Sequence, residues 1–206
     1  MKKLLCILVL CLAGTANASL LGVDFSNPNN WVTSHSDTWA LGYEFSVSSN
    51  AQVDGLGFWD YNGAYNHTTV GLWDTSGTLL GSVDTNSAVS SFATGTGHGT
   101  WNFMNFNYLL TPGSYVVGSH GRGMEYTFNR NGNQIITNVL TYLDPREKRG
   151  SIFQYPSDEF SPGYDAFFGG NVRFAGTGVA EPAAVAILGF GLVVLGFLRK
   201  RKLFKA

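Results

Sequence analysis

Two short segments of the chain place a tryptophan directly before an aspartate, a combination suited to binding a ligand. They read Gly-Phe-Trp59-Asp60 and Gly-Leu-Trp73-Asp74, and Asn62 follows the first of them. An aromatic face flanked by hydrogen-bonding groups suits a sugar ring, whereas carboxylate and amide oxygens are ligands of calcium. The candidate residues for a glycan site or a structural calcium site are therefore Trp59, Asp60, Asn62, Trp73 and Asp74.

The same residues also have a structural interpretation. Gly63 and Gly77 follow the two aspartates by three positions, the spacing of a type I turn in which the carboxylate accepts a backbone N–H. The two tryptophans suit a core pair within one sheet. The sequence has no Asp-x-Asp-x-Asp-Gly calcium loop. Both interpretations stay open, and we expect no cofactor other than a structural calcium ion and no firm metal site.

Few residues have the spacing that catalysis requires. The sequence contains no Gly-x-Ser-x-Gly nucleophile elbow. Ser119 precedes His120, but neighbouring residues on a strand point to opposite faces. Two carboxylates for glycoside hydrolysis must lie close in space, and Asp60 and Asp74 already have turn roles. No pair of histidines has the H-x-H or H-x-x-x-H spacing of a metal site among His35, His67, His98 and His120. We therefore expect no enzymatic activity and no catalytic residues.

Charge is segregated along the chain. The formal net charge is −1, but residues 19–181 hold all fourteen acidic residues and only six basic ones, a net charge of −8. An acidic body is a poor surface for phosphate backbones, so we expect no nucleic-acid partner. Both cysteines, Cys6 and Cys11, lie in the first apolar segment, which leaves the body without a thiol for a disulfide or a metal.

The body that must position these residues has the pattern of β-strands. Residues 39–47 alternate large apolar with small or polar side chains, which predicts a half-buried strand with Glu44 facing solvent. A bulge is predicted at Phe103-Met104, a tight hairpin between residues 70–73 and 78–83, and a long exposed loop over 144–163. Further strands are predicted over residues 53–59, 70–73, 78–83, 100–106, 114–119, 135–143 and 167–174.

Short strands, glycine-rich turns and the absence of a helical period predict an all-β fold. We expect an antiparallel, jelly-roll-like β-sandwich over residues 19–174. The segments Leu41-Gly-Tyr-Glu-Phe-Ser-Val47, Val70-Gly-Leu-Trp-Asp-Thr-Ser-Gly77 and Leu110-Thr-Pro-Gly-Ser-Tyr115 resemble a family of bacterial extracellular β-sandwich domains whose function is unassigned. The resemblance covers about residues 38–120 and implies a fold without an activity or a site.

The first eighteen residues have the pattern of a signal peptide. Lys2 and Lys3 precede the apolar residues 4–12, and a small-x-small sequence, Ala16-Asn17-Ala18, precedes Ser19. We therefore expect a signal peptide over residues 1–18, with Ala16, Ala18 and Ser19 marking the cleavage site. Export of the body follows from this prediction.

A second three-part signal lies at the other end of the sequence. Residues 175–181 are mostly small and predict a linker to a tail over residues 182–206. Residues 183–198 carry no charge and predict one transmembrane helix, and the basic cluster after them predicts a cytoplasmic end. The candidate sorting residues are Glu181, Pro182, Arg199, Lys200, Arg201 and Lys202.

These residues resemble the PEP-CTERM sorting tail of Gram-negative bacteria, although Ala180 stands where that family usually has proline. The resemblance implies processing by an exosortase, a membrane anchor before processing, and exopolysaccharide as a companion. We expect an exported, non-enzymatic protein of the cell surface or the extracellular matrix. Two alternatives stay open. One is a carbohydrate-binding module for exopolysaccharide, with two exposed coplanar aromatics on one face. The other is a simple C-terminally anchored membrane protein.

Overall fold

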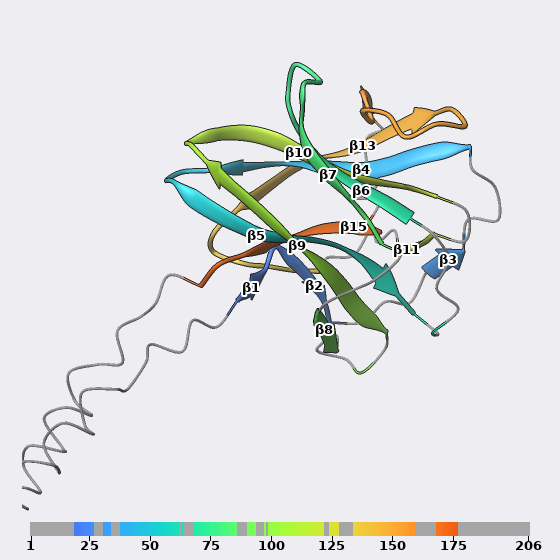
Figure 1. Cartoon of the computed structure of the whole chain (residues 1–206), viewed down its shortest axis with the longest axis horizontal. Helices are drawn as coiled ribbons and strands as arrows, with labels where there is room; N and C mark the ends of the chain where they lie inside the picture. The colour runs from blue at the N-terminus through green and yellow to red at the C-terminus, as the bar shows by residue number, and fades with distance from the viewer. Residues whose placement is uncertain are drawn as a thin grey trace, which may run out of the picture. The chain divides into compact units, whose positions relative to one another are not determined.

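Two antiparallel sheets pack face to face in the body of the chain (Figure 1). Residues 19–175 form one compact unit. The predicted signal peptide, the C-terminal tail and most of the predicted linker lie outside the described residues. The structure is a computed structural model that describes residues 19–26, 31–33, 38–61, 63, 68–85, 90–93, 97, 99–121, 124–127, 134–159 and 168–176.

The regular secondary structure of the described residues consists of β-strands alone. They are β1 (Leu20–Leu21), β2 (Val23–Phe25), β3 (Trp31–Thr33), β4 (Trp39–Val47), β5 (Ala51–Asp60), β6 (Thr68–Asp74), β7 (Leu79–Asp84), β8 (Ser90–Ala93), β9 (Thr100–Leu110), β10 (Gly113–Gly121), β11 (Glu125–Thr127), β12 (Gln134–Ile136), β13 (Thr141–Arg149), β14 (Asp158–Glu159) and β15 (Gly170–Phe174).

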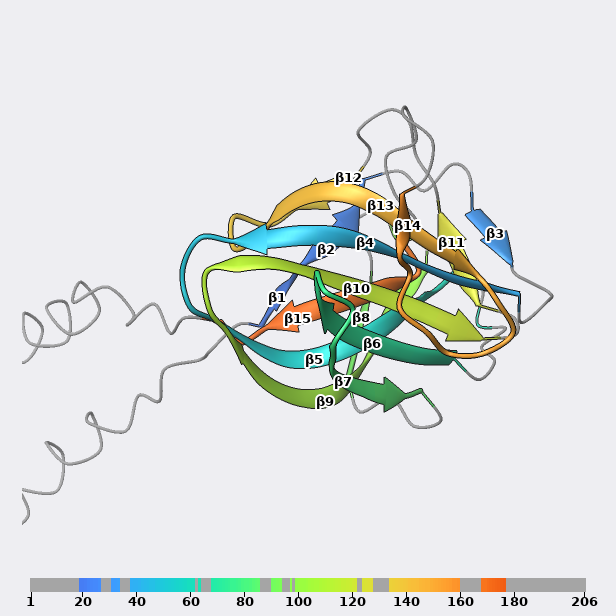
Figure 2. The same cartoon turned by 90° about the horizontal axis from the view of Figure 1, so that it is seen from above.

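The strand order explains how distant segments meet. One sheet has the order β1-β15-β5-β9-β8 and the other β14-β13-β4-β10-β6-β7, with two further pairs, β11-β3 and β12-β2. Strands β9 and β10 follow each other in the chain but enter opposite sheets, where β9 pairs with β5 and β10 pairs with β4 (Figure 2). The predicted all-β antiparallel sandwich is therefore confirmed, and the finer jelly-roll description stays a prediction.

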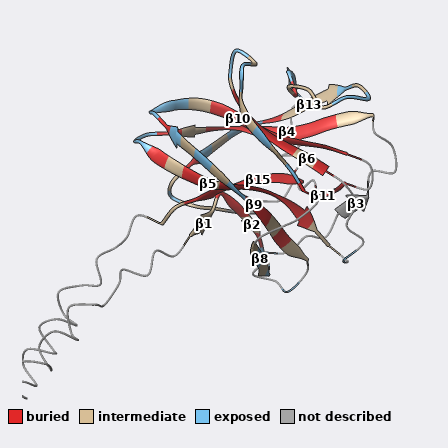
Figure 3. Cartoon of the chain, in the orientation of Figure 1, coloured by how far each residue is buried: buried red, intermediate tan, exposed pale blue. Residues whose placement is uncertain are grey.

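Side chains from both sheets form one continuous buried cluster among the described residues, and many of them are aromatic. Figure 3 shows that buried positions lie on strands of both sheets. The rings of Phe25 and Trp59 meet edge to face, with 4.9 Å between their centroids. Across the sandwich, Tyr43 contacts Phe168 with 5.6 Å between centroids. Such pairs add to the stability that burial of their area provides. The largest fully buried side chains include Tyr43, Phe45, Trp59, Trp101, Phe103, Phe168 and Phe174.

The strand irregularity predicted at Phe103-Met104 lies further along β9. Gly55 pairs with Asn105, but Val53 pairs with Tyr108. The register between β5 and β9 therefore shifts between Asn105 and Tyr108, on the C-terminal side of Met104. Phe103 and Met104 are both buried although they point to opposite sides of the strand. Burial on both faces, rather than a bulge, therefore explains why two apolar residues follow each other there.

Strand β4 is likewise buried on both faces, which its alternating sequence does not predict. Tyr43 and Phe45 are fully buried on one side, while Ala40 and Glu44 are buried on the other. Glu44 accepts a hydrogen bond from the Arg146 guanidinium of β13 in an ion pair. The prediction that Glu44 faces solvent is therefore wrong, because a neighbouring strand supplies a partner for its charge.

The predicted exposed loop over residues 144–163 is also wrong over much of its length. Residues up to Arg149 belong to β13, which pairs with β4, and Asp158 begins β14. Two of the cations in this charged strand have acidic partners. Arg146 pairs with Glu44, and Lys148 Nζ lies 2.9 Å from a carboxylate oxygen of Asp158.

Residues 150–157, which we call the covering segment, pack onto a row of glycines. Gly118 of β10 lies opposite Gly42 of β4 on one side and Gly71 of β6 on the other. A Cβ atom at Gly71 would lie 2.5 Å from the Phe153 ring, and one at Gly118 would lie 3.0 Å from Pro156. The missing side chains at Gly71 and Gly118 therefore create the space that the covering segment fills.

Candidate functional site

Of the five residues predicted to form a glycan or calcium site, the four that the structure describes do not come together. Trp59 and Asp60 lie at the end of β5 in the five-stranded sheet, whereas Trp73 and Asp74 lie at the end of β6 in the six-stranded sheet. Asp74 pairs with Tyr115 near the turn that leads into β5, and Asp60 closes β5 at its far end. The two aspartates are thus roughly 20–30 Å apart along the strands at about 3.3 Å per residue. Asn62 lies outside the described residues.

Both tryptophans are buried, which removes the exposed aromatic face that a sugar-binding site requires. Trp59 is fully buried against Phe25 and Tyr61, and Trp73 is 3% exposed. Trp73 contacts Phe153 and Tyr155 of the covering segment, with ring centroids 5.2 and 6.1 Å away. The two indoles lie in different sheets. The predicted core role is therefore confirmed for each residue, whereas the predicted pair within one sheet is wrong.

The two aspartates have the turn roles that their spacing predicts. Asp60 Oδ1 accepts the Gly63 N–H at 2.8 Å, and Asp74 Oδ1 accepts the N–H groups of Ser76 and Thr78, each at 2.9 Å. These hydrogen bonds, above all the one from the Ser76 hydroxyl, hold the pKa of Asp74 below its usual range. Gly63 and Gly77 have positive φ angles of 75° and 88°.

Metal and nucleophile chemistry find little support in the parts of the chain that the structure describes. Those parts contain no group of three or more His, Cys, Asp or Glu side chains that could hold a metal ion. A calcium ion at Asp60 or Asp74 stays a prediction. The Ser119 hydroxyl donates to the Met124 sulfur at 2.9 Å. Nε2 of His120 is buried and has no hydrogen-bond partner among the described residues. These two neighbours therefore do not form a nucleophile–base pair.

The residues predicted for sorting lie outside the described ranges. This holds for Glu181, Pro182 and the cluster from Arg199 to Lys202, and for Ala16 and Ala18 of the predicted cleavage site. Within the described ranges, no helix is long and apolar enough to span a membrane. Ser19 is described, and its hydroxyl belongs to a cluster of polar side chains around Asp54 and Arg173.

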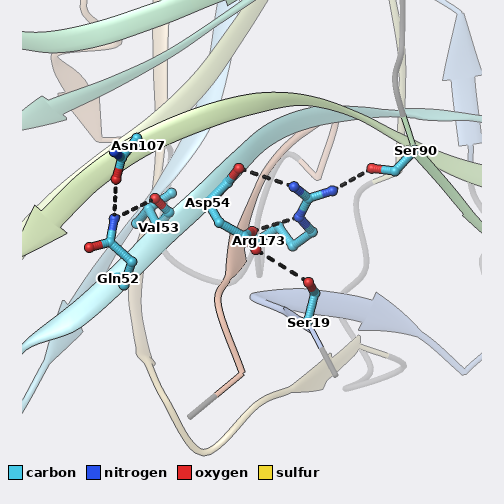
Figure 4. A network of polar contacts seen from close by, with 7 residues as sticks. All are labelled: Ser19, Gln52, Val53, Asp54, Ser90, Asn107 and Arg173. Atoms are coloured by element: carbon cyan, nitrogen blue, oxygen red, sulfur yellow. Dashed lines mark hydrogen bonds and ion pairs between the residues drawn. The ribbon is translucent and has the colours of Figure 1, made fainter. Parts of the chain in front are cut away.

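A buried arginine organises this cluster (Figure 4). The Arg173 side chain on β15 is only 8% exposed. Its Nε donates to Asp54 Oδ1 at 2.6 Å, its Nη2 donates to the Asp54 carbonyl oxygen at 3.0 Å, and its Nη1 donates to the Ser90 hydroxyl. The guanidinium carbon lies 6.0 Å from the Phe92 ring centroid and 5.4 Å from that of Phe103. Paired in this way, the cation can stay buried.

Space for the guanidinium depends on a neighbouring residue without a side chain. Gly55 lies opposite Arg173 on β5, and a Cβ atom there would lie 2.9 Å from the guanidinium carbon. Asp54 is the residue before it, and its side chain is 31% exposed. The guanidinium is therefore enclosed, whereas the carboxylate that neutralises it still reaches water.

The same cluster joins the two ends of the body. Ser19 Oγ donates to Asp54 Oδ2 at 3.2 Å. Leu20 pairs with Phe174, and Leu21 pairs with Arg173, so β1 lies antiparallel to the last strand of the body. Gln52 accepts the Ala175 N–H at 2.9 Å. Ser19 and Ala175, at the two ends of the body, therefore lie near each other beside β5.

Neither Asp54 nor Arg173 stands out by motif in the sequence. The available signal is the position of Arg173 between Val172 and Phe174 in a short apolar strand. A cation in such a strand must be paired, but the pattern does not say with which of the fourteen acidic residues. The pairing is decided by the register of β15 against β5.

The comparisons with known proteins concern the sandwich rather than the ends of the chain. No curated protein and no solved structure matches the sequence. Residues 26–164 match a family described as a domain of unknown function, DUF4082, which agrees with the expected domain of unassigned function. Because the match covers more than half of the sequence, the chain belongs to the DUF4082 family.

Proposed function

We propose that the chain is an exported, non-enzymatic protein of a Gram-negative cell surface or extracellular matrix, held by its C-terminal tail until an exosortase processes it. The observation that carries this proposal is the pairing of β1 with β15. Two segments predicted to engage the membrane thereby join the body at adjacent residues of one sheet edge. With this attachment, the domain can fold on one side of a membrane while both terminal segments lie in that membrane.

The internal architecture supports the same role. Every described strand lies within residues 19–175, and so does the buried cluster. Removal of the signal peptide or of the tail therefore takes no described strand from the sandwich. Trp59 and Trp73 are core residues instead. Asp60 and Asp74 accept turn hydrogen bonds, and the sandwich therefore suits a structural module. The burial of Trp59 and Trp73 removes the specific observation that favoured a carbohydrate-binding module.

The test is mass spectrometry of the terminal peptides of the protein purified from its own host. We expect a first residue of Ser19 and a last residue near positions 180–182. A protein that begins at Ser19 and retains Ala206 would refute exosortase processing and support a permanent membrane anchor. A protein that keeps residues 1–18 would refute export through a cleaved signal peptide.

A pair of variants sharpens this test. Replacing Glu181 and Pro182 with alanine should leave the tail on the protein, because these residues form the proposed recognition site. Glu159→Ala is the matched control, since this glutamate side chain is 70% exposed on the body. The assignment of Glu181 and Pro182 would be contradicted if the first variant still lost its tail. It would also be contradicted if the Glu159→Ala control kept its tail.

A further inference from the structure

We propose that the Asp54 carboxylate binds the α-ammonium group that signal-peptide cleavage creates at Ser19, so that maturation of the chain fastens the edge of the sandwich. The proposal rests on cleavage between Ala18 and Ser19, which is part of the proposed function. It goes beyond that function by assigning a partner to the new chain end.

The cleavage reaction supplies a charge where none existed. Water adds across the Ala18–Ser19 peptide bond, so that Ala18 leaves with a new carboxylate. Ser19 keeps the nitrogen, which takes up a proton and becomes an ammonium group at neutral pH. Before cleavage this nitrogen belongs to a neutral amide. The mature chain therefore carries one additional positive charge at Ser19.

Geometry brings this charge to Asp54. Ser19 Oγ lies 3.2 Å from Asp54 Oδ2. The α-nitrogen of a serine lies roughly 3–4 Å from its own Oγ in the staggered rotamers. The ammonium nitrogen therefore lies at most about 7 Å from Asp54 Oδ2, a separation at which opposite charges still attract each other.

The position of Ser19 is fixed by the strand that follows. Gly22 donates its N–H to the Val172 carbonyl at 2.8 Å, and Leu20 and Leu21 pair with Phe174 and Arg173. Chain ends are usually poorly ordered unless they are tied down in this way. Because β1 is only two residues long, one further interaction at Ser19 changes its local stability appreciably.

The charges around the carboxylate leave one side for the ammonium group. Arg173 on β15 occupies Oδ1, and the uncharged Ser90 on β8 contacts the far side of the guanidinium. Oδ2 receives only the Ser19 hydroxyl among the described residues. The Asp54 carboxylate then lies between two cations, and each cation contacts a different oxygen. Because the carboxylate is partly exposed, water also screens the repulsion between the two cations, so the arrangement stabilises the folded chain.

The expected size of the effect follows from this exposure. A partly exposed ion pair contributes about 0.2–1 kcal/mol. That free energy corresponds to a folding equilibrium constant that is about 1.4- to 5-fold larger. The gain should be concentrated at β1, where it appears as slower hydrogen exchange of the Gly22 amide.

The experiment compares two forms of the body, residues 19–176, which carries its own core. One form begins at Ser19, and the other retains Ala16-Asn17-Ala18 before it. Each form is prepared as wild type, as Asp54→Asn and as Asp144→Asn, the matched control on an exposed position of β13. Urea unfolding gives the folding equilibrium constant of each. We expect the free Ser19 terminus to raise it about 1.4- to 5-fold in the wild type and the control, and to leave Asp54→Asn unchanged.

Two outcomes would overturn the proposal: no gain in the wild type, or the same gain in Asp54→Asn. Acetylation of the Ser19 amine in the wild type gives a second test that needs no substitution. It removes the charge while leaving Asp54 in place, and it should abolish the gain and speed exchange at Gly22. These measurements on the purified body test the contact itself. A native chain that starts elsewhere than Ser19 would instead refute the proposed function.

Discussion

The pair formed by Asp54 and Arg173 gives the most direct test of how the closing strand is held. Arg173 is the buried partner, with three hydrogen-bond acceptors within reach. In Asp54→Asn the side-chain oxygen and the backbone carbonyl remain, but the negative charge is lost. The guanidinium then stays enclosed between Phe92 and Phe103 without a counter-charge. We therefore expect this substitution to destabilise the sandwich.

The magnitude follows from the environment of the pair. A hydrogen bond to a charged group contributes about 1.5–3 kcal/mol, and the partial exposure of Asp54 reduces this to about 1–2 kcal/mol through solvent screening. A body of this size loses about 2–4 °C of melting temperature per kcal/mol, so Asp54→Asn should melt roughly 2–8 °C lower. Arg173→Met should cost about 1 kcal/mol, because it keeps apolar packing and removes the buried charge.

The double variant decides whether the two residues act as a pair. If they do, Asp54→Asn with Arg173→Met should be about as stable as Arg173→Met alone, because the carboxylate has no cation left to neutralise. The coupling free energy from the cycle would then be about 1 kcal/mol or more. Urea unfolding of the four proteins measures it. A double variant whose loss equals the sum of the two single losses would refute the reasoning.

Two further predictions concern the turn after β6 and the glycine row. Because hydrogen bonds lower the pKa of Asp74 in the folded state, its contribution is present above the ordinary carboxyl pKa and is lost as pH falls through the folded value. Asp74→Ala should therefore lower the urea midpoint more at pH 7 than at pH 2, and an equal loss at both pH values would contradict this. In Gly71→Ala the new methyl group would lie 2.5 Å from both Phe153 and Trp73. It should cost about 1–3 kcal/mol and shift the Trp73 fluorescence to the red as the covering segment moves away, whereas an unchanged spectrum and stability would show that the glycine is not needed for space.

Much of the strand layout was predictable from the sequence because it is encoded locally. The alternation around Tyr43 and Phe45 reflects the two-residue period of a strand. The Asp60 and Asp74 turns follow from a carboxylate three positions before a glycine with positive φ. The two end signals are likewise patterns within short segments, and their roles stay predictions because they lie outside the described residues.

The candidate site, in contrast, could not be assembled from local patterns. Trp59 and Trp73 share one motif, yet the crossing from β5 to β6 places them in different sheets. The repeated Trp-Asp motif suggested one shared binding surface. The fold instead buries the two tryptophans at separate positions. A motif fixes which residues are neighbours along the chain, but the sheet that each strand joins depends on pairings with residues far away.

The sequence by itself determined the class of fold and the turns, and it predicts the signal peptide and the sorting tail at the two ends. The tertiary structure alone decided that Glu44 is buried against Arg146, that the covering segment lies on the glycines, and that Arg173 meets Asp54 beside Ser19. The physical reason is that strand periodicity and turn chemistry act over a few residues. Charge pairing and close packing instead depend on which segments of the fold meet. The two charge pairs join residues more than one hundred positions apart.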